Sequence, residues 1–191
     1  MSEPVKKPIN LPPGQREVER PPVHHVGEPP LFDAASWRLS IAGAVENARE
    51  WTWPEVLALP QRDLESDWHG EEGWSVRAVR WSGVPLEALL RDARPQPSAR
   101  FVRFSDGALY DTSLPIEIAL QSDVLLATKL SGELLSARHG APLRLVVASK
   151  YAWKSVKWLR RIELVDSDVP GFWERRGWHN SADPWRAERL A

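Results

Sequence analysis

Three segments of the chain hold the residues whose types and spacing could do chemistry. The first covers residues 67–75 and reads DWHGEEGWS. It offers His69, Glu71 and Glu72 as nitrogen and oxygen donors for a metal ion. Alternate side chains in extended backbone point to opposite faces, so these three residues converge poorly on one ion. A solvated acidic loop beside a hydrogen-bonding structural histidine is the competing interpretation.

The second segment, residues 139–145, reads HGAPLRL. Gly140 would let the backbone pass close to a ligand, and Pro142 fixes the entry into a strand. Arg144 stands in an otherwise apolar run, where a buried guanidinium without an anion is costly. Either an ion pair with an Asp or Glu or a bidentate grip on a phosphate would satisfy this arginine.

The third segment, residues 150–158, reads KYAWKSVKW. Three lysines, a serine hydroxyl and interleaved aromatic rings stand within nine residues. Lysine and backbone N–H groups in such a loop can neutralise a phosphate, although a solvated basic hairpin is the alternative. The formal net charge of the chain is -1, so the sequence predicts no nucleic-acid partner.

Short strands and short helices must position these segments. A capping box from Thr52 to Glu55 predicts a helix that continues through Leu59. The dipeptide Asp106-Gly107 predicts a hairpin between 100–104 and 109–112. Apolar patterning predicts strands at 37–41, 64–68, 124–128, 143–148 and 158–165, and helices at 85–91, 115–120 and 170–176. This mixture predicts an α+β or mainly β fold.

The length of 191 residues suits one domain with a tail. Residues 1–31 carry eight of the 17 prolines, which predicts an extended N-terminal arm, or a strap over the domain, ahead of a domain at residues 32–191. No run of about 18 apolar residues and no apolar leader is present, so we expect a cytoplasmic protein with no membrane partner. Zero cysteines exclude disulfides, thiolate zinc sites and a cysteine nucleophile.

The order of these segments resembles one known family. The succession DWHxxxGWS, RWSGVPLEALL, DVLLATKLSGE, HGAPLRLVV, KYAWKSVKW and PGFWERRGWHN is similar to that of the sulfite-oxidase-like molybdopterin oxidoreductases, over residues 11–188. The resemblance implies an α+β fold of mixed β-sheets with short helices that binds a molybdopterin cofactor carrying molybdenum. It also implies oxygen-atom and two-electron transfer on a small substrate such as sulfite or a sulfoxide. The chain has no haem-ligand motif, so the electron partner would be a separate protein.

The resemblance also implies which residues bind the cofactor: His25, His69, His139, Arg144, Ser155, Val156 and Lys157. His139 stands at the pterin-binding position of an (N/H)GAP motif, and Arg144 at the position of a phosphate-binding arginine. The segment 155–157 matches the one whose backbone and lysine cradle the phosphate. His25 matches an N-terminal strap that touches the cofactor, and His69 matches the histidine before the metal ligand.

One departure from the family pattern concerns the metal. The family segment is close to D-F-H-C-V-x-G-W-S, and its cysteine is the protein ligand to molybdenum. Gly70 takes that place here, so the sequence predicts no protein metal ligand and assigns no catalytic residue. The carboxylates of Glu71 and Glu72 would repel an anionic substrate such as sulfite.

Three functions remain open from the sequence. The chain could be an oxidoreductase in which the cofactor's dithiolene alone holds molybdenum. It could instead be a non-catalytic module that binds the cofactor or a related phosphorylated ligand, or a scaffold with an empty site whose tryptophan-rich surface binds a protein. Substitution Gly70→Cys is expected to create thiolate ligation if the rest of the pocket still fits.

Overall fold

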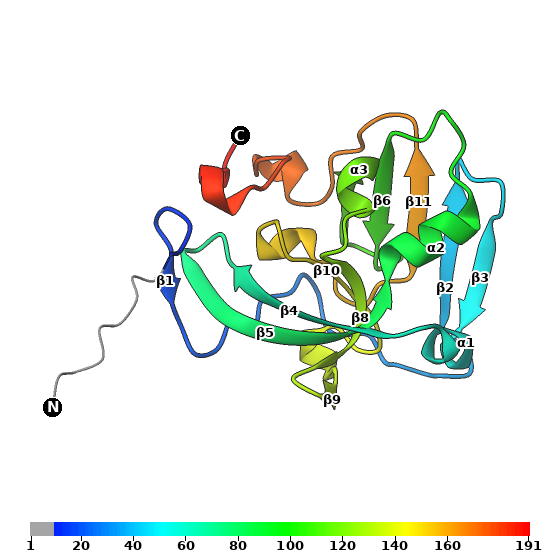
Figure 1. Ribbon diagram of the computed structural model, residues 1–191, viewed down its shortest axis with the longest axis horizontal. Coiled ribbons are helices and arrows are strands. Elements are labelled where there is room, and N and C mark those ends of the chain that lie inside the picture. The colour runs from blue at the N-terminus through cyan, green and yellow to red at the C-terminus, as the bar shows by residue number, and fades with distance from the viewer. Residues whose placement is uncertain (1–9) are drawn as a thin grey trace, which may run out of the picture.

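Two β-sheets with short helices between their strands make up the computed structural model, which describes residues 10–191 (Figure 1). The six-stranded sheet has the order β1-β5-β8-β10, with β4 beside β5 and β9 beside β8. Its strands are β1 (Arg16–Glu17), β4 (Arg62–His69), β5 (Trp74–Pro85), β8 (Val124–Leu130), β9 (Glu133–Leu134) and β10 (Arg144–Val147). Strand β1 runs parallel to β5, whereas the other pairs are antiparallel.

The second sheet has five strands in the order β3-β2-β11-β6-β7. Its strands are β2 (Arg38–Gly43), β3 (Arg49–Thr52), β6 (Phe101–Ser105), β7 (Asp111–Pro115) and β11 (Arg161–Val165). Strands β2 and β11 are parallel, and the remaining pairs are antiparallel. Both sheets are therefore mixed, which confirms the α+β fold implied by the resemblance.

The helices are short and begin where the sequence signals place them. Helix α1 (Trp53–Ala58) has the predicted capping box, in which Thr52 and Glu55 exchange side-chain and backbone hydrogen bonds. Helices α2 (Leu86–Ala93) and α3 (Ile116–Ala119) follow β5 and β7. The helix predicted at 170–176 is reduced to a 3-10 turn at Glu174–Arg176.

Two apolar clusters lie on the two sides of β10. Leu145 and Val147 face the larger cluster, which contains residues of both sheets and of α2. Val146 faces a smaller cluster that contains Trp68, Trp74 and Trp81. Because side chains alternate along a strand, Arg144 lies on the same side of β10 as Val146, beside these tryptophans.

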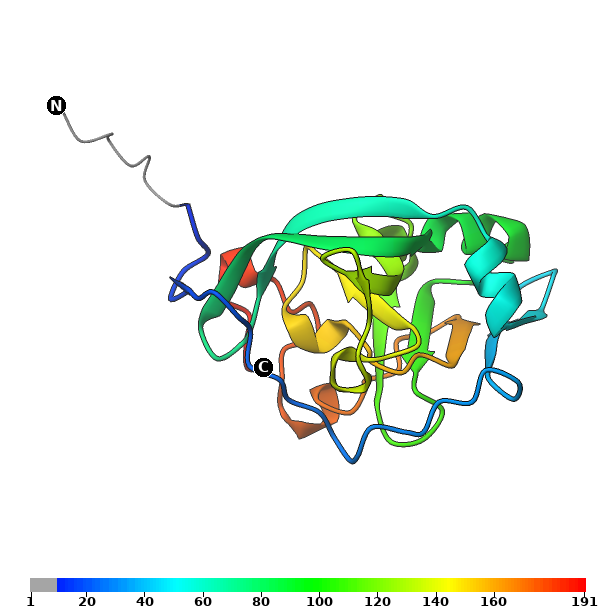
Figure 2. The same ribbon diagram turned by 90° about the horizontal axis from the view of Figure 1, so that it is seen from below.

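The described part of the N-terminal arm is a strap held against the first sheet. The backbone N–H of Val18 donates to the carbonyl of Ser75 (2.8 Å), and the N–H of Arg16 donates to Gly73 (2.9 Å). From there the chain crosses one face of the molecule to reach β2 (Figure 2). Residues 10–31 therefore form a strap, which was one of the two forms predicted for the arm. Residues 1–9 lie outside the described residues.

Four strands, β1, β3, β5 and β9, were not expected from the sequence. The longest of them is β5, which continues for 12 residues and pairs with β1, β4 and β8. Strand β3 gave no alternating signal because its four residues, REWT, bury only Trp51. Within residues 10–191 no helix is long and apolar enough to cross a membrane.

Candidate functional site

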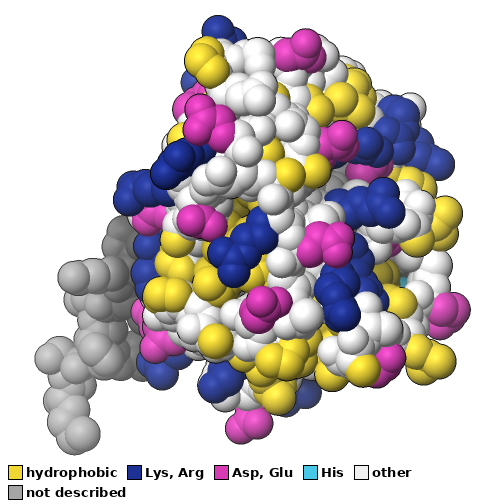
Figure 3. Space-filling model, turned by 90° about the vertical axis from the view of Figure 1, so that its right-hand side faces the viewer, with side chains coloured by type: hydrophobic (Ala, Val, Ile, Leu, Met, Phe, Trp, Pro, Cys, Tyr) yellow, Lys and Arg dark blue, Asp and Glu magenta, His cyan; other side chains and the backbone are white. Residues whose placement is uncertain are grey.

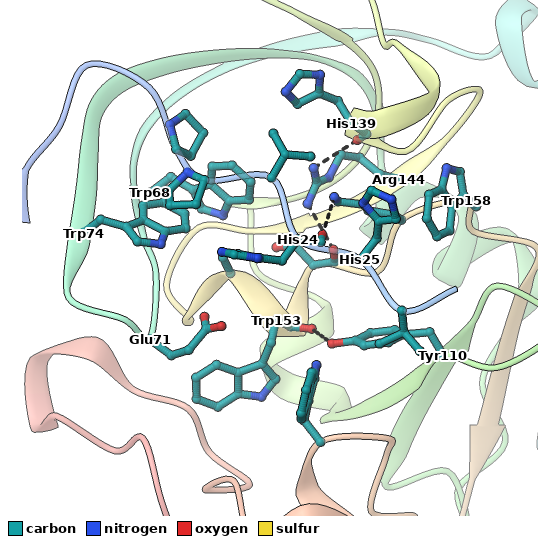
Figure 4. A pocket seen from close by; sticks show the side chains of 18 residues that line it. His24, His25, Trp68, Glu71, Trp74, Tyr110, His139, Arg144, Trp153 and Trp158 are labelled. Carbon is teal, nitrogen blue, oxygen red and sulfur yellow. Dashed lines mark hydrogen bonds between the residues drawn. The ribbon is translucent and has the colours of Figure 1, made fainter. Parts of the chain in front are cut away.

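A cavity lies between the strap and the edge of the first sheet, and it collects five of the seven predicted cofactor-binding residues. These are His25, His139, Arg144, Ser155 and Lys157. Figure 4 shows His139, Arg144 and Trp158 on one side of the cavity, and Glu71, Trp153 and Tyr110 on the other. We call the first side the cationic end and the second the aromatic end.

Arg144 is the central residue of the cationic end and is 1% exposed. Its guanidinium donates to the backbone carbonyls of His139 (3.0 Å) and Ser155 (3.1 Å) and lies 4.9 Å from the ring centre of Trp68. Its Nε has no hydrogen-bond partner, and no carboxylate of residues 10–191 pairs with it. Burial lowers the pKa of Arg144 to about 9. The ion-pair interpretation is therefore wrong, and an anion is what this guanidinium lacks.

The loop after Arg144 adds backbone donors to the same end. A 3-10 turn at Ala152–Lys154 leads into Ser155, whose Oγ accepts from the N–H of Val147 (3.1 Å) and keeps its own hydrogen free to donate. Among the described residues, no acceptor is found for the N–H groups of Val156 and Lys157. Consecutive N–H groups without acceptors can form an anion-binding concavity. The side chain of Val156 is fully buried in the larger core cluster, so only its backbone can take the predicted role.

Lys157 joins this loop to the strap. Its ammonium donates to the carbonyls of His24 (2.6 Å) and Arg138 (2.9 Å). Burial and then the neighbouring charges of Arg144 and Arg138 lower the pKa of Lys157 to about 7. A lysine at this pKa is held among cations, and a bound phosphate would relieve that repulsion.

Gly140 and His139 form the wall above the guanidinium. Gly140 has φ of +106°, and an added Cβ would lie 3.1 Å from both Arg144 Cβ and Lys157 Cα. The expected close approach of the backbone at Gly140 is thus seen in the structure. Burial lowers the pKa of His139, and the charges of Arg144 and Lys157 lower it further, so its imidazole is neutral near pH 7. A neutral ring there can accept or donate a hydrogen bond without adding charge.

The strap supplies His25, whose ring meets that of Trp158 edge-on at 5.6 Å. Its neighbour His24 lies 3.1 Å from Glu72 at the protein surface. These contacts, with Lys157, fix the strap over the cavity. The predicted contact of His25 with the cofactor stays a prediction, because the structure shows only that the residue lines the cavity.

His69 lies outside the cavity wall. On β4 the side chain of Trp68 faces the cavity, and the next residue therefore points to the opposite side. His69 Nδ1 is 2.8 Å from Ser75 Oγ, and its ring lies edge-on to Trp185 at 6.4 Å. The structure thus places His69 as a buried hydrogen-bonding residue and does not bring it to the other predicted residues.

The acidic residues of the DWHGEEGWS segment separate in space. Glu71 lines the aromatic end, where burial raises the pKa of its carboxyl group, while Glu72 contacts His24 at the surface. No group of three or more His, Cys, Asp or Glu that could hold a metal ion is found in residues 10–191. The interpretation of His69, Glu71 and Glu72 as one metal site is therefore not supported.

Two residues of the aromatic end, Tyr110 and Trp173, were not predicted from the sequence as site residues. Tyr110 Oη donates to the carbonyl of Trp153 (2.6 Å), and burial raises the pKa of Tyr110 well above its usual value. Trp173, from the C-terminal segment, also lines the cavity. No local pattern marks these residues, because they come from segments about 40 and 60 residues apart that meet only in the fold.

Lys154 belongs to the segment for which a solvated basic hairpin was the alternative interpretation, and its side chain is fully buried. Its ammonium lies 2.5 Å from Glu174 Oε1 and 3.1 Å from the carbonyl of Ser113. This ion pair ties the C-terminal segment to the loop that forms the cavity. The solvated-hairpin interpretation of residues 150–158 is wrong for this lysine, since the loop turns inward at Ala152–Lys154.

The surface seen on the β3 side of the molecule carries basic and acidic side chains interspersed, with no block of one sign (Figure 3). Positive charge is instead gathered inside the cationic end. An anion in the cavity would be held by these local contacts.

Comparison with known protein families matches residues 25–173 to the oxidoreductase molybdopterin binding domain. The chain is 36% identical over 181 residues to the uncharacterized oxidoreductase YuiH of Bacillus subtilis, covering 94% of this chain and 91% of that protein. It is 33% identical over 162 residues to MsrP of Gluconobacter oxydans, a protein-methionine-sulfoxide reductase catalytic subunit, covering 75% of this chain and 52% of that one. The chain thus spans nearly all of the first relative and about half of the second.

Among solved structures, the sulfane dehydrogenase SoxCD of Paracoccus pantotrophus aligns with a TM-score of 0.65. The alignment covers 88% of this chain and 57% of that one, at 23% sequence identity. This likeness shows that the two proteins share the fold.

Proposed function

Because the chain belongs to the family of oxidoreductase molybdopterin binding domains, we propose that the cavity binds molybdopterin with its phosphate at the cationic end. Arg144 and Lys157 would hold the phosphate together with the free N–H groups of Val156 and Lys157. His139 and the Trp158 ring would contact the pterin. The residues present fit the phosphate of this cofactor, since Arg144 Nε and the backbone N–H groups of Val156 and Lys157 have no acceptor among the described residues.

The observation that carries this proposal is the buried guanidinium without a counter-ion. Burying an ion without a partner costs several kcal/mol even after relaxation. A chain keeps such a residue where a ligand offsets the cost, and the planar fork of Arg144 suits a phosphate. No other fully buried cation of the described chain is left in this state, since Lys154 has Glu174.

We propose that the reaction is oxygen-atom transfer on a small uncharged substrate. The bound cofactor would supply a molybdenum centre able to exchange an oxygen atom and two electrons. Glu71 is the only acidic residue that lines the cavity. In its ionised form it would repel an anion such as sulfite, and in its protonated form its Oε–H could donate to a neutral oxide such as a sulfoxide. A separate protein would carry the electrons.

A second candidate is a module that binds the cofactor without redox work. Gly70 offers no ligating side chain, and the described chain contains no alternative metal cluster. This function needs only the cationic end. It predicts bound pterin without turnover, whereas the oxidoreductase predicts both.

Cofactor analysis of the full chain, purified from a host that makes molybdopterin, tests these proposals. We expect pterin, measured by fluorescence after oxidation, at about one per chain, because the donors of one phosphate site are present. Molybdenum by elemental analysis, with turnover of a sulfoxide, would support the oxidoreductase. Pterin without turnover of sulfite, sulfoxide or N-oxide substrates would support the binding module. Absence of pterin would contradict both.

A further inference from the structure

The turn that contains Gly70 is packed against the ring of Trp74. The Gly70 N–H donates to the carbonyl of Trp74 (2.8 Å), and the Gly70 carbonyl accepts from Gly73 (3.1 Å) and from the side chain of Gln15 (2.9 Å). A Cβ added at Gly70 would lie 1.9 Å from Trp74 Cε2, 2.2 Å from Nε1 and 2.4 Å from Cζ2. The indole therefore lies directly on the Cα of Gly70, in the space that any larger residue would need.

The obstacle to a side chain at this position is the ring and not the backbone. Gly70 does not have a positive φ, unlike Gly73 (φ +90°), so an L-residue would suit its backbone. All three of the nearest atoms belong to the Trp74 side chain. The atoms that an added Cβ would meet first thus belong to a single side chain, which makes the cause testable.

The ring is held by further aromatic contacts. Trp74 is 6% exposed and meets Trp68 edge-on at 5.5 Å, and Trp68 meets Trp81 in the same way at 5.2 Å. The Arg144 guanidinium lies over Trp68 and Trp81. Displacing the Trp74 ring would disturb this stack, because close-packed side chains do not move singly.

We propose that the indole of Trp74 fills the space of the absent side chain at position 70 and closes that position to a metal ligand. The resemblance places a cysteine and this tryptophan together in the family pattern, which requires the ring to lie elsewhere when the cysteine is present. Here the glycine admits the ring. A side chain at position 70 would therefore meet the Trp74 ring, and we expect Gly70→Cys alone to give no ligand. The sequence predicted ligation only if the rest of the pocket still fits, and that condition requires the ring to move. The proposal builds on the assignment of the cavity as the cofactor site.

Because the chain contains no cysteine, an introduced thiol is unique and can be followed by its reaction with Ellman's reagent. The experiment uses the cofactor-free full chain with Gly70→Cys, Trp74→Ala, the double variant Gly70→Cys/Trp74→Ala, and Glu71→Cys as the control. Glu71 is the next residue and lines the cavity, so its cysteine reports normal access. Melting temperature and thiol reaction rate are measured for each variant.

In the presence of Trp74 we expect Gly70→Cys to lower the melting temperature by at least about 5 °C, as overpacking does in a chain of this size. In the Trp74→Ala background the same substitution should cost less than about 2 °C, and its thiol should react within about threefold of the Glu71→Cys thiol. If Gly70→Cys alone fails to fold, a folded and reactive double variant supports the proposal equally.

A Gly70→Cys variant that keeps its melting temperature and reacts as fast as Glu71→Cys would overturn the proposal, because the ring would then yield freely. An equal loss of stability in both backgrounds would overturn it too, since Trp74 would not be the cause. None of these measurements depends on bound cofactor, so failure of the cofactor assignment would appear separately, as absent pterin in the unsubstituted chain.

Discussion

Two buried cations, Arg144 and Lys154, lie ten residues apart in sequence. They differ in whether the protein supplies a counter-ion. The Lys154 ammonium lies 2.5 Å from the Glu174 carboxylate and also donates to a backbone carbonyl, so its charge is neutralised inside the protein. Arg144 has only carbonyl acceptors and an Nε with none. Lys154 is therefore complete within the fold and ties the C-terminal segment down. Arg144 has no counter-ion among the described residues, and we propose that a bound anion takes that place.

The two ends of the cavity differ in the same sense. At the cationic end, Arg144 Nε and the N–H groups of Val156 and Lys157 have no acceptor among the described residues, whereas at Gly70 the Trp74 ring fills the space of a side chain. We propose that the cofactor's phosphate binds at the first place and that the second offers it no protein ligand. The residues proposed to bind the phosphate thus lie apart from Gly70, so substitutions can test each place separately.

The largest change in stability is expected at Lys154, the buried cation that has a counter-ion. Lys154→Met leaves Glu174 buried without its partner, which should lower the free energy of unfolding by about 3–5 kcal/mol. Urea or thermal unfolding measures it. The exposed pair of Arg80 with Glu65 supplies a matched control, because Arg80→Met should cost less than about 1 kcal/mol. Equal costs at the two sites would contradict the structural role of Lys154.

Substitution of Arg144, the buried cation without a counter-ion, should change stability in the opposite direction. Arg144→Met removes an unpaired buried charge while keeping an apolar chain of similar length, so the cofactor-free protein should gain about 1–4 kcal/mol of stability. Thermal unfolding of the cofactor-free chain checks the sign. A loss as large as that of Lys154→Met would mean that the fold itself satisfies Arg144.

Lys157 should make the stability of the cofactor-free chain depend on pH. Its folded pKa of about 7 lies below the value of about 10.4 in the unfolded chain, so between these values the unfolded state binds more protons. Stability should therefore rise as pH increases from 7 towards 10. Lys157→Met should reduce this rise, because methionine does not titrate. The test is to measure the melting temperatures of the unsubstituted chain and of Lys157→Met at pH 7 and pH 9. An equal rise in melting temperature for the two proteins would contradict the lowered pKa of Lys157.

The smallest effect is expected at the aromatic end. If the chain turns over substrates, Glu71→Gln should raise the ratio of sulfite to sulfoxide turnover by about threefold to tenfold, since it removes one nearby negative charge. Glu72→Gln is the control, because Glu72 contacts His24 outside the cavity wall. An unchanged ratio for Glu71→Gln would remove the basis for an uncharged substrate.

The sequence predicted the elements with local signals. The capping box at Thr52, the hairpin around Asp106-Gly107 and the alternating strand that buries Ile162 and Leu164 are all present. Strand β5 was missed in part because its pairing with β1, β4 and β8 is long-range and leaves no local pattern. Local sequence signals therefore predict where helices and strands occur. The length of a strand depends on the strands with which it pairs.

The site was predictable to the extent that its residues cluster in sequence. His139, Arg144, Ser155 and Lys157 come from two neighbouring segments and meet in the cavity. The burial of Lys154 and the packing of Trp74 on Gly70 were not predictable. They depend on the C-terminal segment and on the exact path of a turn, which the sequence pattern does not encode.

The pterin content of Arg144→Met is the measurement that tests the central claim most directly. The variant and a control, Arg160→Met, are purified from a host that makes molybdopterin; Arg160 lies over Trp37, outside this cavity. If Arg144 binds the phosphate, Arg144→Met should retain less than about a tenth of the pterin of the unsubstituted chain, because a charge-assisted phosphate contact is lost. Arg160→Met should retain the pterin content of the unsubstituted chain. Pterin at the unsubstituted level in a folded Arg144→Met protein would contradict the account.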